Sequence, residues 1–168
     1  TPRSAGTCMS GGSIGESLIL DFTRYMNKLV SFNPSNFSQI TVMPGMYYRD
    51  FEKITLEKGM ILPCYTASKN INAVGGMYGN NSAGERTLSY GKTEEFIAEA
   101  KVVFSDGNLY TVRPLSERDL AIKIMKNDFE GNLYKKIYDM ILANREELAN
   151  AKPKVTKNSA GYYLWNVV

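Results

Sequence analysis

Short apolar runs near the start of the chain predict β-strands. The run Leu18-Ile19-Leu20-Asp21-Phe22 is strand-forming and follows fifteen residues rich in Gly and Ser, for which we expect a loop. A second strand is predicted over residues 38–43, where Ile40 and Val42 share one face. Pro44-Gly45 then ends that run in a turn.

Helical spacing follows in two places. Apolar side chains from Tyr47 to Leu56 recur at near-helical intervals, which predicts a helix over residues 47–58 that ends near Gly59. The stretch 116–150 is also predicted to be helical, with Pro153 ending it. Its broad apolar face, which we expect to pack in the core, carries Leu133, Tyr134, Ile137, Tyr138 and Ile141.

Two glycine-containing segments lie between these helices. Residues 75–91 are rich in Gly, Asn and Ser and are expected to form a loop. Residues 99–104 and 109–112 flank Ser105-Asp106-Gly107-Asn108, and Asp-Gly is a strong signal for a tight turn between antiparallel strands. The sequence therefore predicts a hairpin there.

Composition excludes several classes of protein. A chain of 168 residues is one domain or a piece of one, and it has no run near the roughly 18 apolar residues that a membrane-spanning helix needs. The net charge is only +3 and the Lys and Arg residues are scattered, so we expect no nucleic-acid partner.

Histidine is absent from the chain, which excludes a Ser/His/Asp triad, a Cys/His nucleophile pair and a His-ligated metal. Cys8 and Cys64 are far apart and show no CxxC spacing. We therefore expect two free thiols in a reducing compartment, with neither a metal site nor a disulfide framework.

The two ends of the sequence do not resemble natural termini. The chain opens at Thr1-Pro2-Arg3 without a signal region and closes with the apolar segment 161–168. We interpret it as part of a longer chain. Because such a part exposes an apolar face that the rest would cover, we also expect self-association.

The first glycine-rich tract suits an anion. Without Cβ atoms, glycines let successive backbone N–H groups turn toward one phosphate. Residues 6–12 have the spacing of a P-loop's two glycines, but Gly12 stands where the P-loop lysine would be, and neither tract contains GxGxxG. The alternative for either tract is a tight surface loop.

Several motifs taken together resemble a known family. They are Pro2 to Gly12, Val42-Met43-Pro44-Gly45, Gly75-Gly76 followed by Asn80-Asn81-Ser82-Ala83-Gly84, Tyr90-Gly91-Lys92-Thr93, and Lys157-Asn158-Ser159-Ala160-Gly161-Tyr162. In order and spacing they resemble the PCMH-type FAD-binding domain of the vanillyl-alcohol oxidase superfamily. The best likeness is to the branch of bacterial D-lactate dehydrogenases and the glycolate oxidase FAD subunit.

The resemblance implies an α+β fold in which a small parallel α/β subdomain packs on a mainly antiparallel sheet flanked by helices, with FAD between them. Residues 1–168 would be a partial FAD-binding domain, comprising the end of the first subdomain and most of the second. The opening βαβ unit and the C-terminal substrate domain would lie outside this chain.

The same likeness assigns residues to the cofactor. Backbone N–H groups of the loop 4–12 and the hydroxyls of Thr7 and Ser10 would bind the diphosphate, although Cys8 departs from the usual small or hydroxyl residue. Arg3 would be a phosphate counter-charge or merely solvated, and Asn80 and Asn81 would bind the flavin ring or adopt left-handed turns. The stretch from Pro63 to Ser68, with Gly75-Gly76, matches the part of the family's domain that passes along the flavin. The full set is Arg3, Ser4, Ala5, Gly6, Thr7, Cys8, Ser10, Gly11, Pro63, Thr66, Ala67, Ser68, Gly75, Gly76, Asn80, Asn81, Gly84, Gly91 and Thr93.

The implied reaction is oxidation of a small-molecule D-2-hydroxy acid such as lactate or glycolate, by hydride transfer to the flavin N5. The resemblance identifies neither the catalytic base nor the electron acceptor, and it implies a cytoplasmic protein, at most peripheral to the inner face of the membrane. Residues 1–168 alone are expected to be inactive. The alternatives are an ether-lipid synthase of the alkyl-dihydroxyacetonephosphate synthase type and a non-catalytic module that binds no flavin.

Overall fold

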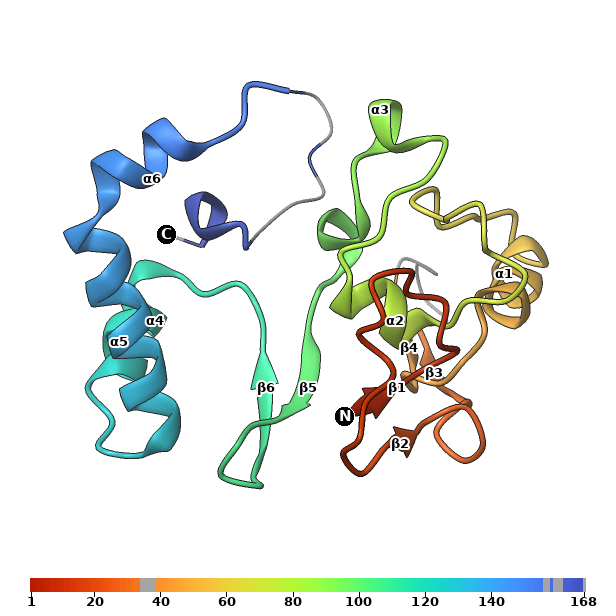
Figure 1. The fold of residues 1–168 in the computed structure, drawn as a ribbon, viewed down its shortest axis with the longest axis horizontal. Coiled ribbons are helices and arrows are strands. Elements are labelled where there is room, and N and C mark those ends of the chain that lie inside the picture. The colour runs from red at the N-terminus through yellow and green to blue at the C-terminus, as the bar shows by residue number, and fades with distance from the viewer. Residues whose placement is uncertain (34–38, 156–157, 159–161, 168) are drawn as a thin grey trace. The chain divides into compact units, whose positions relative to one another are not determined.

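The computed structural model describes residues 1–33, 39–155, 158 and 162–167 and divides the chain into two compact units, Thr1–Phe96 and Ile97–Val168. Helices and small sheets occur in both units, which confirms the α+β class (Figure 1). Within the described ranges the strands form three separate two-stranded sheets, two of them antiparallel.

The first unit contains two of these sheets. Strand β1 (Pro2–Arg3) pairs in parallel with β2 (Leu20–Asp21), and β3 (Leu29–Phe32) pairs antiparallel with β4 (Ile40–Val42). The strand predicted over 38–43 is confirmed at residues 40–42 as β4, while residue 38 lies outside the described residues; the run 18–22 contributes only β2. The expected loop over the first fifteen residues is wrong at β1, because Leu20 and Phe22 donate their N–H groups to the carbonyls of Thr1 and Arg3.

The helices of the first unit confirm one predicted helix and show helical structure where a loop was expected over residues 75–91. The predicted helix over 47–58 is confirmed as α1 (Tyr48–Leu56), and Gly59 follows it in the left-handed region with a φ of 69°. The stretch 75–91, expected to be a loop, contains much of α2 (Val74–Gly79) and all of α3 (Thr87–Tyr90), and the 3-10 helix Thr93–Phe96 follows.

Tertiary packing explains why α2 is helical despite its glycines. The N–H of Gly75 donates to the carbonyl of Pro44 at 2.8 Å. A β-carbon on Gly75 would lie 2.6 Å from the β-carbon of Pro44, so only glycine allows this approach. Contact with a distant turn therefore outweighs the low helix propensity of glycine.

The core of the first unit lies between α1 and α2. The most buried side chains are Tyr48, Cys64 and Met77, and Met46, Phe51 and Tyr65 pack around them. The hydroxyl of Tyr48 donates to the carbonyl of Leu62 at 2.8 Å, and burial raises the pKa of that phenol well above its usual range. This core holds the segment 62–65 against α1.

The second unit begins with the predicted hairpin, confirmed as β5 (Ala100–Val103) and β6 (Leu109–Val112). The stretch 116–150, predicted to be helical, contains three helices separated by short breaks: α4 (Glu117–Ile124), α5 (Phe129–Ala143) and α6 (Arg145–Ala151). Asp128 caps α5, since its carboxylate accepts a 2.7 Å hydrogen bond from the N–H of Gly131. A 3-10 helix, Leu164–Asn166, lies near the end.

The apolar face of α5 packs as expected only in part. Ile141 is buried, whereas Leu133, Tyr134, Ile137 and Tyr138 are half-buried. The helical region stops at Ala151, shortly before Pro153, as predicted. Of the resembling segment 157–162, residues 157 and 159–161 lie outside the described residues.

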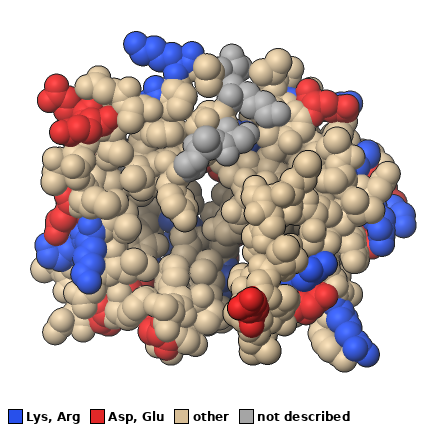
Figure 2. Space-filling view, in the orientation of Figure 1, with Lys and Arg blue, Asp and Glu red and all other residues tan. Residues whose placement is uncertain are grey.

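Charged residues of both signs lie on the surface. On the face shown in Figure 2, Lys and Arg are interspersed with Asp and Glu and separated by uncharged surface. Among the described residues, no helix is long and apolar enough to cross a membrane.

Candidate functional site

The loop formed by residues 4–12 is shaped by glycine backbone geometry. Gly6 and Gly11 have φ values of 71° and 75°, a region that other residues rarely adopt. A β-carbon on Gly6 would lie 2.5 Å from Nη2 of Arg3, so the guanidinium covers this glycine directly. The structure thus places the positive charge of Arg3 at the start of the loop.

The loop leaves a series of backbone donors unused. In the stretch 1–33, which is fully described, no N–H group from Ala5 to Met9 donates to a protein oxygen, and the N–H of Ser10 is directed to the Cys8 thiol. The N–H of Gly11 turns back to the carbonyl of Cys8 at 3.3 Å, which folds the loop on itself. Thr7 and Ser10 are exposed, so their hydroxyls are accessible as well.

Cys8 shows that this loop favours negative charge. The backbone N–H of Gly12, and next that of Ser10, lower the pKa of the Cys8 thiol below its ordinary value. These amides therefore stabilise an anion at a position beside the unused N–H groups. The side chain at position 8 is a thiol, and the loop keeps this property of its backbone.

The carbonyl of Pro44 connects the loop to α2. It accepts a hydrogen bond from Oγ of Ser4 at 3.0 Å and another from the N–H of Gly75. A β-carbon on Gly76 would lie 3.6 Å from that of Ser4. Two predicted segments separated by about seventy residues are therefore neighbours, as a shared binding site requires.

The segment 63–68 contributes a pair of hydroxyl groups. Thr66 Oγ1 and Ser68 Oγ are 2.8 Å apart, and the amide Nδ2 of Asn72 donates to Thr66 Oγ1 at 2.8 Å. Pro63 is half-buried and Ala67 is exposed. Asn72 was not predicted as a site residue, although a polar residue between the apolar residues Ile71 and Ala73 was a signal.

A third group of predicted residues is held together by main-chain contacts. Thr93 donates from both its N–H and its hydroxyl to the carbonyl of Ser82, and Asn81 accepts from the N–H of Glu94 at 3.0 Å. Asn81 has a φ of 43°, so the left-handed alternative holds there, whereas Asn80 is exposed with a φ of −95°. Gly91 also has a positive φ, of 77°.

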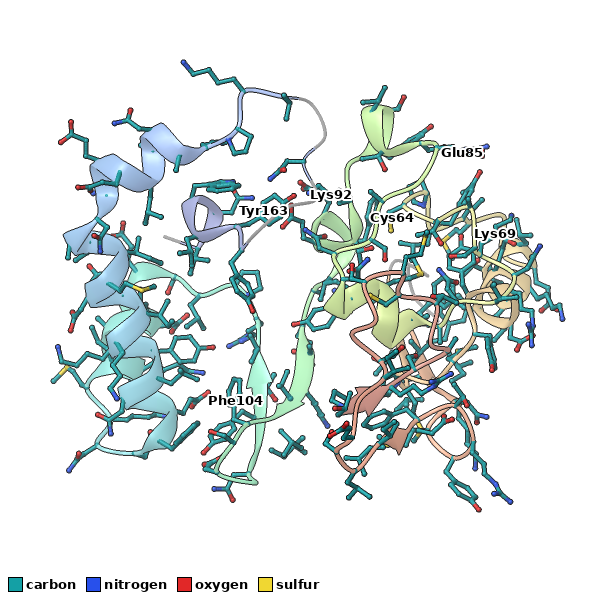
Figure 3. The ribbon with its side chains drawn as sticks, viewed as in Figure 1. Cys64, Lys69, Glu85, Lys92, Phe104 and Tyr163 are labelled. Carbon is teal, nitrogen blue, oxygen red and sulfur yellow. The ribbon has the colours of Figure 1, made fainter. Side chains whose placement is uncertain are left out.

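Tyr65, which was not predicted from the sequence, links this group to the core. Its hydroxyl donates to Glu85 at 2.7 Å, and Lys69 Nζ lies 4.7 Å from its ring centroid. Glu85 and Lys69 are labelled in Figure 3. The hydrogen bond to Glu85, together with burial, raises the pKa of the phenol. Lys69 also forms a 2.9 Å ion pair with Glu52 of α1.

These residues fit the diphosphate of FAD. The loop 4–12 combines unused N–H groups, two exposed hydroxyls, an arginine and amides that already favour a thiolate. The chemistry of the donor set is that of an anion site. Within the described part of the chain, no group of His, Cys, Asp and Glu side chains is placed to hold a metal ion.

The chain is similar to several oxidoreductases. D-2-hydroxyglutarate dehydrogenase of Escherichia coli (strain K12) is 26% identical over 99% of this chain, which corresponds to 16% of that protein. The glycolate oxidase subunit GlcD of Bacillus subtilis (strain 168) is 30% identical over 71% of this chain and 26% of its own length. The chain thus spans a small part of each relative.

Solved structures support the fold. An alkyldihydroxyacetonephosphate synthase structure matches 70% of this chain and 24% of its own with a TM-score of 0.58, at 19% sequence identity. At that identity the likeness concerns the fold alone. The sequence model described as the FAD binding domain matches residues 1–113, two thirds of the chain and all three groups of predicted residues. With this match, the chain belongs to the FAD binding domain family.

Proposed function

We propose that this chain holds FAD within a longer flavin-linked enzyme that oxidises a D-2-hydroxy acid. The observation that carries the cofactor half is the geometry of the loop 4–12, where the N–H groups from Ala5 to Met9 donate to no protein oxygen and the guanidinium of Arg3 lies against Gly6. The substrate half is supported by the names of the relatives, which include a D-2-hydroxyglutarate dehydrogenase and a glycolate oxidase subunit.

The residues of this chain would bind and orient the cofactor. Backbone donors of the loop would hold the diphosphate, and Arg3 would offset its negative charge. The hydroxyls of Thr66 and Ser68 lie in the stretch that the resemblance places along the flavin. When bound, FAD would supply the hydride acceptor, while the groups that bind the substrate would come from elsewhere in the longer protein.

The ether-lipid synthase alternative is not favoured. The likeness to the synthase is at 19% identity and concerns the fold, whereas the dehydrogenase and oxidase relatives match in sequence. Membership of the FAD binding domain family also argues against a module that binds no flavin.

Uptake of FAD tests the proposal. We expect the purified chain, incubated with FAD and desalted, to keep the visible absorbance bands of the flavin. Gly6→Ala should weaken binding by about ten-fold or more, because alanine disfavours the left-handed backbone at this position and its β-carbon would displace the guanidinium of Arg3. Gly107→Ala is the matched control, since Gly107 also has a positive φ but lies in the β5–β6 turn.

If this chain retains no flavin, the same measurement is repeated on the full-length parent protein. If this chain retains no flavin but the parent does, residues outside the chain complete the site. A parent that cannot take up FAD would overturn the proposal. The substrate half is tested by adding D- and L-lactate, glycolate and D-2-hydroxyglutarate to the flavin-loaded parent: bleaching by none of these acids would refute it.

A further inference from the structure

Asn72 is a buried amide with an unused acceptor. The residue is only 3% exposed, and its Oδ1 has no hydrogen-bond partner in the part of the chain that the structure describes. Burying an unpaired amide oxygen costs free energy, so such a group in a folded protein calls for an explanation. An apolar side chain of similar size would avoid this cost.

The amide nitrogen of Asn72 explains why the residue is buried with an unpaired oxygen. Nδ2 can only donate, so Thr66 Oγ1 is the acceptor of their 2.8 Å hydrogen bond. Accepting this bond polarises the Thr66 hydroxyl toward donating its own hydrogen to Ser68 Oγ, 2.8 Å away. The hydroxyl hydrogen of Ser68 is then free to point outward from the pair.

The backbone holds this arrangement in place. The N–H of Asn72 donates to the carbonyl of Ser68 at 2.9 Å, and its carbonyl accepts from the N–H of Tyr48 at 3.1 Å, at the start of α1. The turn 66–72 is therefore closed by main-chain and side-chain bonds together. Thr66 and Ser68 remain half-buried, so a ligand can reach the end of the hydroxyl pair while Asn72 stays inaccessible.

We propose that Asn72 is a positioning residue that fixes the direction of the hydrogen bonds from Asn72 through Thr66 to Ser68, and so makes Ser68 a donor to an acceptor atom of bound FAD. The inference rests on the proposed function and deepens it. The chemical class recognised is a hydrogen-bond acceptor, and the ring carbonyls and ring nitrogens of the flavin are acceptors of this kind.

A variant that removes donor and acceptor together separates this role from a structural one. In the double variant Asn72→Leu/Thr66→Val both partners become apolar, so we expect the free energy of unfolding without FAD to be unchanged or slightly raised. FAD affinity should fall by about five- to ten-fold, and the shape of the visible flavin band should change. Asn70→Leu, which alters an exposed amide nearby, should change neither.

Two further variants test the direction of the bonds. Asn72→Asp keeps a side chain that can bond to Thr66 but can only accept there, which would reverse the direction and turn a lone pair of Ser68 outward. Asn72→Asp should lower FAD affinity as much as the double variant does. Ser68→Ala should also lower FAD affinity by that amount. Adding Ser68→Ala to Asn72→Leu/Thr66→Val should cause no further loss of affinity.

The outcomes are distinguishable. Loss of FAD affinity with stability retained, together with non-additivity with Ser68→Ala, supports the role of Asn72. A double variant that binds FAD as tightly as the unchanged chain, with the same spectrum, overturns it, as does a loss of affinity explained by unfolding. If neither the unchanged chain nor the full-length parent takes up FAD, the proposed function fails and this inference fails with it.

Discussion

A β-carbon on Gly84 would lie 1.7 Å from the carbonyl oxygen of Tyr65, so the backbones of two distant segments are in direct contact. The N–H of Gly84 is bonded to Oγ1 of Thr87 at 2.8 Å, which limits how far this segment can move. The contact fixes the stretch 82–93 against the stretch 63–68, and both carry residues assigned to the cofactor.

Gly84→Ala is therefore expected to destabilise the first unit. The added carbon forces backbone atoms apart, which typically costs about 1–3 kcal/mol in the free energy of unfolding. Urea unfolding followed by circular dichroism measures it. Gly79→Ala is the control, because nothing lies within 4 Å of a β-carbon there and the residue is helical, so stability should be unchanged or slightly higher. Equal effects of the two substitutions would contradict the contact.

Tyr65→Phe should change how stability depends on alkaline pH. The hydrogen bond to Glu85 raises the pKa of Tyr65 in the folded state, so its contribution is fully present below the ordinary tyrosine pKa of about 10 and is lost as the pH rises toward the folded value. We expect the variant to be less stable at neutral pH and the difference to shrink above about pH 10.

Unfolding curves measured over a pH series test this expectation. The control is Tyr25→Phe, since the side chain of Tyr25 is 73% exposed and the substitution should leave stability unchanged throughout the series. A difference between Tyr65→Phe and the unchanged chain that stays constant at all pH values would show that the hydrogen bond does not control the titration.

Local signals explain which elements could be predicted from the sequence. The hairpin is set by Asp106-Gly107 and α1 by its own apolar spacing, so both were predicted. The helix α2 was not, because its glycines are tolerated through contact with Pro44. Strand β1 was not predicted either, since it forms only by pairing with β2.

The residues of the candidate site also fall into those that could be predicted from the sequence and those that could not. The loop 4–12 was recognisable because glycine spacing and hydroxyl residues follow one another in the sequence. Asn72 and Tyr65 were not recognised, since their roles depend on burial and on partners brought close by folding. A sequence shows where glycines allow unusual backbone conformations, but it does not show which polar group is buried without a hydrogen-bond partner.

Cys8 is expected to react with iodoacetamide faster than Cys64 at neutral pH. Amides of the loop lower the pKa of Cys8, whereas burial raises that of Cys64, so Cys8 has the larger thiolate fraction and the better access. Peptide mass spectrometry over a time course measures both rates, and FAD should slow the reaction of Cys8. A Cys8 rate profile with its midpoint at or above about pH 8.5, the value of a free thiol, would contradict the anion-favouring loop.

The buried ion pair of the second unit should be sensitive to removal of its cation. Lys123 Nζ lies 2.5 Å from Oε1 of Glu130, and Glu130 is only 7% exposed. Lys123→Met leaves the carboxylate with Lys126 at 3.9 Å and should cost about 3 kcal/mol of unfolding free energy. Lys135→Met breaks the exposed pair with Asp139 and should cost less than about 1 kcal/mol. Similar costs in thermal unfolding would mean that Glu130 is effectively solvated.

The segment 9–30 should drive self-association of the purified chain. Met9, Leu18 and Tyr25 are 103%, 79% and 73% exposed, and Leu20 of the parallel pair β1–β2 is 53% exposed. Parallel strands are normally covered on both faces. The exposed apolar side chains of the segment 9–30 can therefore be buried when two copies of the chain associate. We expect light scattering to show a mass that rises with concentration. Leu18→Gln/Leu20→Gln should reduce this rise, whereas Ile122→Gln/Met125→Gln, a control on exposed apolar positions of the second unit, should have less effect. A constant monomer mass at high concentration would refute the prediction.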